Sequence, residues 1–145
     1  EQFLRLVKKG GIIHMLNEDY GLLFCHPSKK DTTKIWEAAR AYFDSTGGTG
    51  EFGRKCYHLL KKINTPRVME SIHIHYIQVD TIKVHRDIIS KIFTTWRDGY
   101  NKVLAQHATV SETELWETWN ALLETTEDPS SYSCWQLMLY TVKVQ

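Results

Sequence analysis

Apolar residues recur at intervals of three and four positions in four segments of the chain, and this spacing restricts those segments to amphipathic helices. In the first of them, Ile35 and Ala39 fall on one helical face. Ser111 and Glu114 form the capping box that opens the last of them. The predicted helices cover residues 31–44, 52–63, 85–106 and 111–124.

Other parts of the chain have the composition of strands. Residues 72–79 are rich in β-branched and aromatic side chains, and apolar residues alternate there with polar ones. Residues 11–16 and 22–25 are apolar runs, and the polar, glycine-containing residues 17–21 between them predict a turn. The pattern therefore predicts two N-terminal strands joined by a turn, with residues 72–79 as a further strand of the same small antiparallel sheet.

The C-terminal segment has two interpretations. Asp128 followed by Pro129 at the first helical position predicts a fifth helix, whereas residues 137–144 also fit a terminal strand. With the helix, the chain is an α+β protein of about five helices, helix-dominated, built as one compact domain over residues 1–145. Because it begins with Glu1 rather than Met, we expect this domain to be excised from a larger protein.

Cysteine usage and hydropathy limit the class of protein. Cys25, Cys56 and Cys134 are odd in number and far apart, which is typical of neither a disulfide framework nor a zinc site. Buried free thiols are usual in reducing compartments, and no run approaches the roughly 18 apolar residues of a membrane span. We expect an intracellular protein, in cytosol or nucleus, without membrane contact, cofactor or small-molecule substrate.

Charge is distributed unevenly along the chain. Residues 1–67 hold twelve basic and seven acidic residues, and residues 103–142 contain no Lys or Arg at all. If the two parts occupy separate faces, the protein is an electrostatic dipole that can orient a partner. The alternative is that folding mixes these charges in space.

Residues 11–23 run from glycine through an apolar stretch to Asn17, a predicted turn and Tyr20. The pattern resembles the first two strands of cold-shock and related OB-type domains, small barrels that stack single-stranded nucleic-acid bases on aromatic rings. The family's stacking positions fall on Met15 and Leu22, which have no ring. With the basic N-terminal half, the resemblance implies a nucleic-acid site. Its candidate residues are His14, Tyr20, Lys29, Lys30, Arg54 and Lys55.

His73 and His75 are two positions apart on the predicted strand, so their imidazoles project from one face and can bind one metal ion. The Ile-His-Ile-His-Tyr run resembles the His-apolar-His element of replication-initiator and relaxase nucleases. The resemblance implies Asp80 or Glu70 as a further metal ligand and Tyr100 as the nucleophile. The alternatives are two histidines on the wetter face of a half-buried strand, or a pH-sensitive pair.

The glycine-rich residues 44–55 precede a helix, where backbone amides can bind phosphate. The Lys-Ser/Thr pair of a phosphate loop is missing, because Arg54 and Lys55 stand in its place. The favoured interpretation is a mobile loop between two helices.

The helix over residues 111–124 carries two tryptophans among acidic residues. They pack in the core, or they anchor a protein partner within an acidic rim, since Trp is enriched in interface hot spots. No motif assembles a reacting centre, so the sequence predicts a non-enzymatic interaction domain that binds another protein or a second copy. A single-stranded nucleic-acid binder or a metal-dependent nuclease is the alternative. The candidate partner-binding residues are Trp116, Trp119, Glu114 and Glu117.

Overall fold

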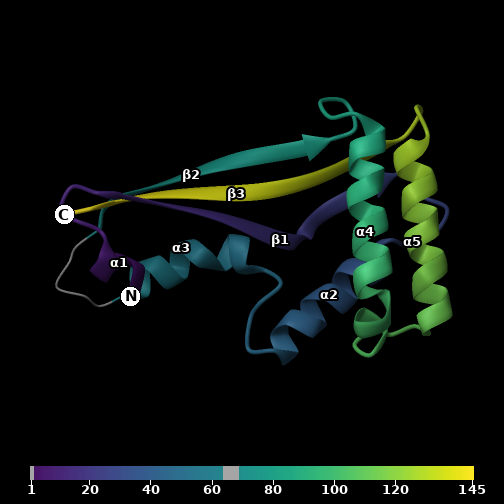
Figure 1. Ribbon diagram of the computed structural model, residues 1–145, viewed down its shortest axis with the longest axis horizontal. Helices are drawn as coiled ribbons and strands as arrows, with labels where there is room; N and C mark the ends of the chain where they lie inside the picture. The colour runs from purple at the N-terminus through teal and green to yellow at the C-terminus, as the bar shows by residue number, and fades with distance from the viewer. Residues whose placement is uncertain (1, 64–68) are drawn as a thin grey trace. The chain divides into compact units, whose positions relative to one another are not determined.

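The structure, a computed structural model, describes residues 2–63 and 69–145, apart from the side chains of Leu4, Met69 and Glu70. The described residues form an α+β fold, as the sequence predicts (Figure 1). The elements in chain order are α1 (Gln2–Leu6), β1 (Ile12–His26), α2 (Thr33–Ser45), α3 (Phe52–Lys62), β2 (Met69–Asp80), α4 (Arg86–Ala105), α5 (Glu112–Glu127) and β3 (Tyr132–Val144).

The three strands form one antiparallel sheet in the order β1-β3-β2. Gly10 N donates to Val144 O at 2.7 Å, and Val144 N donates to Gly11 O at 3.0 Å, so β1 begins where β3 ends. At the other end of β3, Ser133 O accepts from Thr81 N at 3.1 Å, just after β2. The C-terminal strand is therefore the central one, and β1 and β2 are its neighbours.

Four of the predicted helices are confirmed as α2, α3, α4 and α5. The capping residue of α5 is the predicted one, because Ser111 Oγ accepts from Glu114 N at 3.2 Å. Gly99 lies inside α4 without interrupting it. The short helix α1 was not among the predicted elements.

The predicted fifth helix is wrong, because residues 132–144 form β3. Asp128 accepts from the amide and hydroxyl of Ser130, and Ser131 N donates to Asp128 O, so this segment makes a tight turn instead of a first helical turn. The competing interpretation, a terminal strand, is the correct one. A central strand finds hydrogen-bond partners on both sides, which local propensity does not reveal.

The predicted turn at residues 17–21 is also wrong, because β1 is one continuous strand. Two of its polar side chains, Asn17 and Asp19, are buried, and the amide of Asn17 donates to Met15 O at 3.4 Å. Asp19, which is fully buried, pairs with Arg54 of α3. The two N-terminal strands implied by the OB-type resemblance are therefore absent from this three-stranded sheet.

The chain separates into two compact units. Unit 1 comprises residues 1–19, 51–77 and 137–145, and unit 2 comprises residues 20–50 and 78–136. Each unit takes a part of all three strands. The prediction of a single domain stays a prediction.

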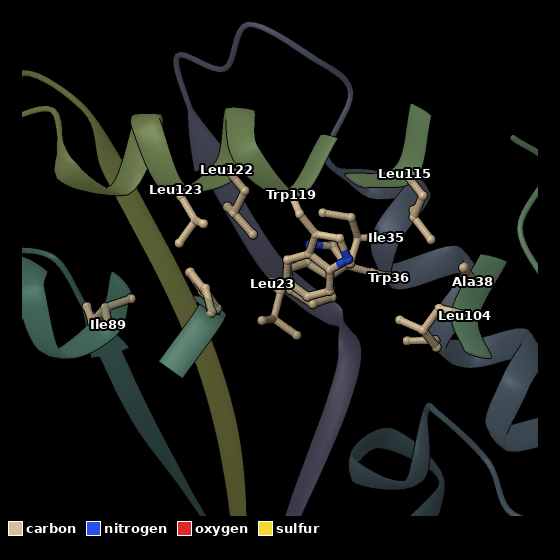
Figure 2. Close-up of a cluster of buried hydrophobic side chains, with 12 residues drawn as sticks. Leu23, Ile35, Trp36, Ala38, Ile89, Leu104, Leu115, Trp119, Leu122 and Leu123 are labelled. Carbon is tan, nitrogen blue, oxygen red and sulfur yellow. The ribbon is translucent and has the colours of Figure 1, made fainter. Parts of the chain in front are cut away.

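Unit 2 has an aromatic-rich core between its helices and strand segments (Figure 2). Trp36 packs edge-on against Trp119, with ring centroids 5.5 Å apart. Both indole nitrogens are buried without a hydrogen-bond acceptor among the described residues. The cluster comprises Leu23, Ile35, Trp36, Ala38, Ala39, Ile89, Phe93, Leu104, Leu115, Trp119, Leu122 and Leu123.

In unit 1, α3 packs directly on one face of the sheet. Tyr140 donates its hydroxyl to Gly53 O at 2.7 Å. A Cβ on Gly53 would lie 3.0 Å from the Cβ of Asp19, so glycine permits this close approach of helix and strand. Burial raises the pKa of both Tyr140 on β3 and Cys56 on α3, so both side chains remain neutral.

The glycine segment between α2 and α3 begins with two residues, Gly47 and Gly48, that cap the C-terminus of α2. Gly47 has a φ of +79°, and Gly48 N donates to Phe43 O at 3.0 Å, which closes the C-terminus of α2.

All three cysteines are free, with Cys56 and Cys134 buried and Cys25 half-buried. In the described part of the chain, no helix is long and apolar enough to cross a bilayer.

Candidate interaction surface

The two faces of the sheet in unit 1 differ in burial. On β1, Ile13 and Asp19 are buried, whereas Ile12 and Leu16 are 54% and 58% exposed. On β3, the even-numbered residues from Met138 to Val144 are all buried. Side chains alternate between the faces of a strand, so one face lies under α3, and no helix of the described residues covers the other, which is called the open face below.

The open face gathers side chains from all three strands. His14 Nδ1 lies 3.1 Å from Thr141 Oγ1, which pairs the even residues of β1 with the odd residues of β3. On β2, His73 and His75 are exposed and Ile72 and Ile74 are half-buried, while Tyr76 is 66% exposed. The hydrogen bond from Thr81 N to Ser133 O aligns odd residues of β2 with odd residues of β3, so the odd residues of β2 belong to this face. The open face comprises Ile12, His14, Leu16, His73, His75, Ile77, Leu137, Leu139 and Thr141.

These nine residues are apolar or carry an imidazole, apart from the hydroxyl of Thr141, and the same alternation adds Glu18 of β1 and Lys143 of β3 to this face. Charged residues are depleted in the cores of protein interfaces, where apolar side chains concentrate. Ile77, at 39% exposure, adds a third exposed apolar side chain to Ile12 and Leu16.

The predicted metal set is not gathered at one point. His73 and His75 share a face, but the described residues contain no group of three or more His, Cys, Asp or Glu placed to hold a metal ion. Asp80 accepts from Ile82 N and Lys83 N, each at 2.9 Å, and so organises the turn after β2. Tyr100 is exposed on α4 in unit 2, whereas both histidines belong to unit 1. The side chain of Glu70 lies outside the described residues.

No protein-family model matches this chain. No curated protein matches it significantly either.

The predicted partner-binding residues of α5 have different environments. Trp119 is 1% exposed and belongs to the core, so it cannot contact a partner in this fold. Trp116 is 39% exposed and lies under the guanidinium of Arg97, whose carbon is 4.4 Å from the ring centroid. The two acidic residues already have internal partners: Glu114 pairs with Lys34 at 3.1 Å, and Glu117 pairs with Lys30.

The predicted nucleic-acid residues also have internal partners. Tyr20 is half-buried and stacks on Phe43, with centroids 5.4 Å apart, so its ring is not a free platform for a base. Lys29 pairs with Glu124 at 2.7 Å, and Lys55 with Glu51 at 3.1 Å. Lys30 and Arg54 pair with carboxylates as described above, while His14 lies on the open face. The set divides between the two units: His14, Arg54 and Lys55 belong to unit 1, and Tyr20, Lys29 and Lys30 belong to unit 2.

The charge asymmetry of the sequence takes a different form in the fold. Three lysines that follow β1 in the chain form ion pairs with glutamates of α5, so basic and acidic side chains are mixed within unit 2. The pairs are Lys29 with Glu124, Lys30 with Glu117 and Lys34 with Glu114. Counted by unit, unit 1 holds nine basic and five acidic residues, and unit 2 holds nine and twelve. The excess of basic residues therefore lies in unit 1 and the excess of acidic residues in unit 2, and each unit combines segments from both halves of the sequence.

Sequence reasoning missed Ile12, Leu16 and the free edge of β2. The signal for the first two was present, since apolar residues at 12 and 16 alternate with inward residues along an unbroken strand. Placing a turn at residues 17–21 concealed that alternation. The edge position of β2 follows only from the strand order, which no local pattern encodes.

Proposed function

We propose that this protein is a non-enzymatic interaction module that associates with a protein partner or with a further copy of itself through the uncovered sheet of unit 1. The observation that carries the proposal is the open face: three exposed apolar side chains and three histidines on a sheet that α3 backs from one side only. A partner would supply the second layer that such a sheet lacks.

Burial of this face supports association of moderate strength. Complete burial of one large aliphatic side chain contributes about 1.5–3 kcal/mol. Ile12, Leu16 and Ile77 already lose part of their exposure within the monomer, so each contributes about half of that range. The cost of ordering two molecules offsets much of the sum. We therefore expect a reversible contact and not a permanent one.

Nucleic-acid binding is less well supported, although unit 1 has more basic than acidic residues. Affinity for a phosphate backbone comes from cations that exchange small counterions for phosphates. Arg54 and Lys55, the basic candidates in unit 1, already have carboxylate partners within the unit. This pairing reduces what they can contribute to a phosphate contact.

The test of the proposal is a matched pair of surface substitutions. Leu16→Glu places a charge on the open face, and Leu59→Glu places the same charge on α3, where Leu59 is 44% exposed. Immobilised protein is used to capture partners from native extract, and self-association is followed by sedimentation equilibrium. We expect Leu16→Glu to weaken the captured or self-associated complex at least tenfold, while Leu59→Glu leaves it unchanged. Equal behaviour of both variants and the parent protein would refute a contact through the open face.

A further inference from the structure

The outer edge of β2 lacks the features that usually protect an edge strand. Among the described strands β2 pairs with β3 alone, so its other side is free. Residues 71–79 contain no Lys, Arg, Asp, Glu, Pro or Gly. Natural edge strands are protected by charges, prolines or bulges, and an unprotected one is a template for pairing with another strand.

Half of the backbone groups of β2 point toward this free edge. Amide direction alternates along a strand. At the end of β2, Thr81 N donates to Ser133 O of β3, so the amides of odd-numbered residues face β3. The amides of Ile72, Ile74 and Tyr76 then face outward, where a second strand can bond to them.

The same segment is nearly a palindrome. Reading outward from Ile74, the neighbours are His73 and His75, and the next pair is Ile72 and Tyr76. An antiparallel pairing of two copies centred on Ile74 therefore sets isoleucine against isoleucine, histidine against histidine and Ile72 against Tyr76. Cross-strand pairs of like character are the units that stabilise a sheet. The pairing is isologous, as a two-fold dimer requires.

We infer that β2 pairs edge to edge with β2 of a second copy, antiparallel and centred on Ile74, so that two three-stranded sheets join into one of six. This inference goes beyond the proposed function, because it names a second copy of the protein as the partner and assigns the contact to a different surface. The contact uses backbone hydrogen bonds at an edge, whereas the proposed open-face contact uses apolar side chains.

In the inferred register His73 of one copy lies opposite His75 of the other in a pair without mutual hydrogen bonds, where side chains are closest. The other strands place His14 and Glu18 of β1 and Lys143 of β3 on the same face.

The experiment is sedimentation equilibrium on the intact chain between 10 and 500 µM, a range chosen for a weak dimer. Ile74→Pro removes one outward amide, and Ile74→Val is its matched control, since proline is tolerated where an edge amide faces solvent. We expect a dimer at pH 7.5 that Ile74→Val preserves and Ile74→Pro weakens at least tenfold. Circular dichroism establishes that Ile74→Pro is folded. Should it unfold, amide exchange of the parent protein replaces it: the amides of Ile72, Ile74 and Tyr76 gain protection as concentration rises.

A monomer at 500 µM and pH 7.5, or a dimer without protection of the three outward amides, overturns the inference. A dimer abolished by Leu16→Glu but not by Ile74→Pro also overturns it and leaves the open-face function standing. A dimer that is weakened by Ile74→Pro but not by Leu16→Glu supports pairing through the edge of β2 and contradicts a contact through the open face.

Discussion

At the scale of single residues, the most consequential contact in unit 1 is a buried carboxylate with an exposed partner. Asp19 is fully buried, and its two oxygens accept from Arg54 Nε and Nη2, each at 2.7 Å. It also accepts from Arg54 N at 3.1 Å, near the start of α3. The guanidinium is about half-exposed, and the paired carboxylate raises the pKa of Arg54. One side chain therefore fixes both the strand and the beginning of the helix.

This asymmetry predicts unequal effects of removing either partner. Arg54→Met leaves a buried carboxylate without its cation and is expected to lower the free energy of unfolding by about 3–5 kcal/mol. Asp19→Asn leaves a guanidinium that water can solvate, so we expect a smaller loss of about 1–3 kcal/mol. Urea denaturation followed by circular dichroism measures both. Equal losses, or a larger loss for Asp19→Asn, would contradict this account of the pair.

At the scale of elements, two different kinds of contact hold α5. Its acidic side pairs with lysines through exposed side chains, as in the contact of Lys29 with Glu124. Its C-terminal end is held by Arg86, whose guanidinium donates to Thr126 O at 2.8 Å and to Ser131 O at 2.7 Å. Exposed ion pairs contribute about 0–1 kcal/mol, whereas a cation at the carbonyls of a helix end satisfies both hydrogen bonds and the helix dipole.

The element-scale prediction compares these two contacts. Arg86→Met leaves several carbonyls without their donor and is expected to cost about 2–4 kcal/mol of unfolding free energy. Glu124→Gln removes an exposed pair and is expected to cost less than about 0.5 kcal/mol. Thermal denaturation of the two variants against the parent protein distinguishes the contacts. A Glu124→Gln loss as large as that of Arg86→Met would show that the lysine pairs, and not the helix end, hold α5.

At the scale of the whole molecule, acid is expected to act on unit 2 through its turn-forming aspartates. A hydrogen bond from the Thr33 hydroxyl lowers the pKa of Asp31, and one from the Ser130 hydroxyl lowers the pKa of Asp128. Burial opposes ionisation of Asp80, but the hydrogen bonds from Lys83 N, Ile82 N and Gln78 outweigh it and lower its pKa. All three residues belong to unit 2.

The sign of the pH effect follows from these directions. A carboxyl whose pKa is lower in the folded state stabilises the protein above its unfolded pKa of about 3.9, and this stability is lost as pH falls through the folded pKa. We expect unfolding free energy to be level from neutrality to about pH 4 and to decline below it. Asp80→Asn should flatten part of the decline when tryptophan fluorescence is followed between pH 7 and 2. If Asp80→Asn leaves the decline of unfolding free energy with falling pH unchanged, Asp80 does not contribute to the acid transition.

At high pH the expected behaviour has the opposite sign. A hydrogen bond with Cys134 raises the pKa of Tyr132 to about 12. A phenol whose pKa is raised in the folded state contributes stability that is complete below the unfolded value of about 10 and is lost as pH rises toward 12.

The sequence by itself determined the elements whose pattern is local. The stripe of Ile35 and Ala39 and the capping box at Ser111 predicted α2 and α5, because helix periodicity and capping depend on neighbours within a few residues. The alternation around His73 and His75 predicted a strand with both imidazoles on one face for the same reason. These features need no knowledge of what packs against them.

Only the tertiary structure decided where polar residues are buried and which strands are edges. In the sequence Asp19 suggests a turn, but in the fold it is buried in β1 because Arg54 of α3, which is far away in the sequence, pairs with it. The C-terminal segment becomes a strand because partners on both sides satisfy its backbone groups. Trp119 and Trp116 have the same residue type and sit three positions apart, yet one is core and the other surface. Pairing, burial and edge position are long-range properties, set by packing between segments far apart in the chain.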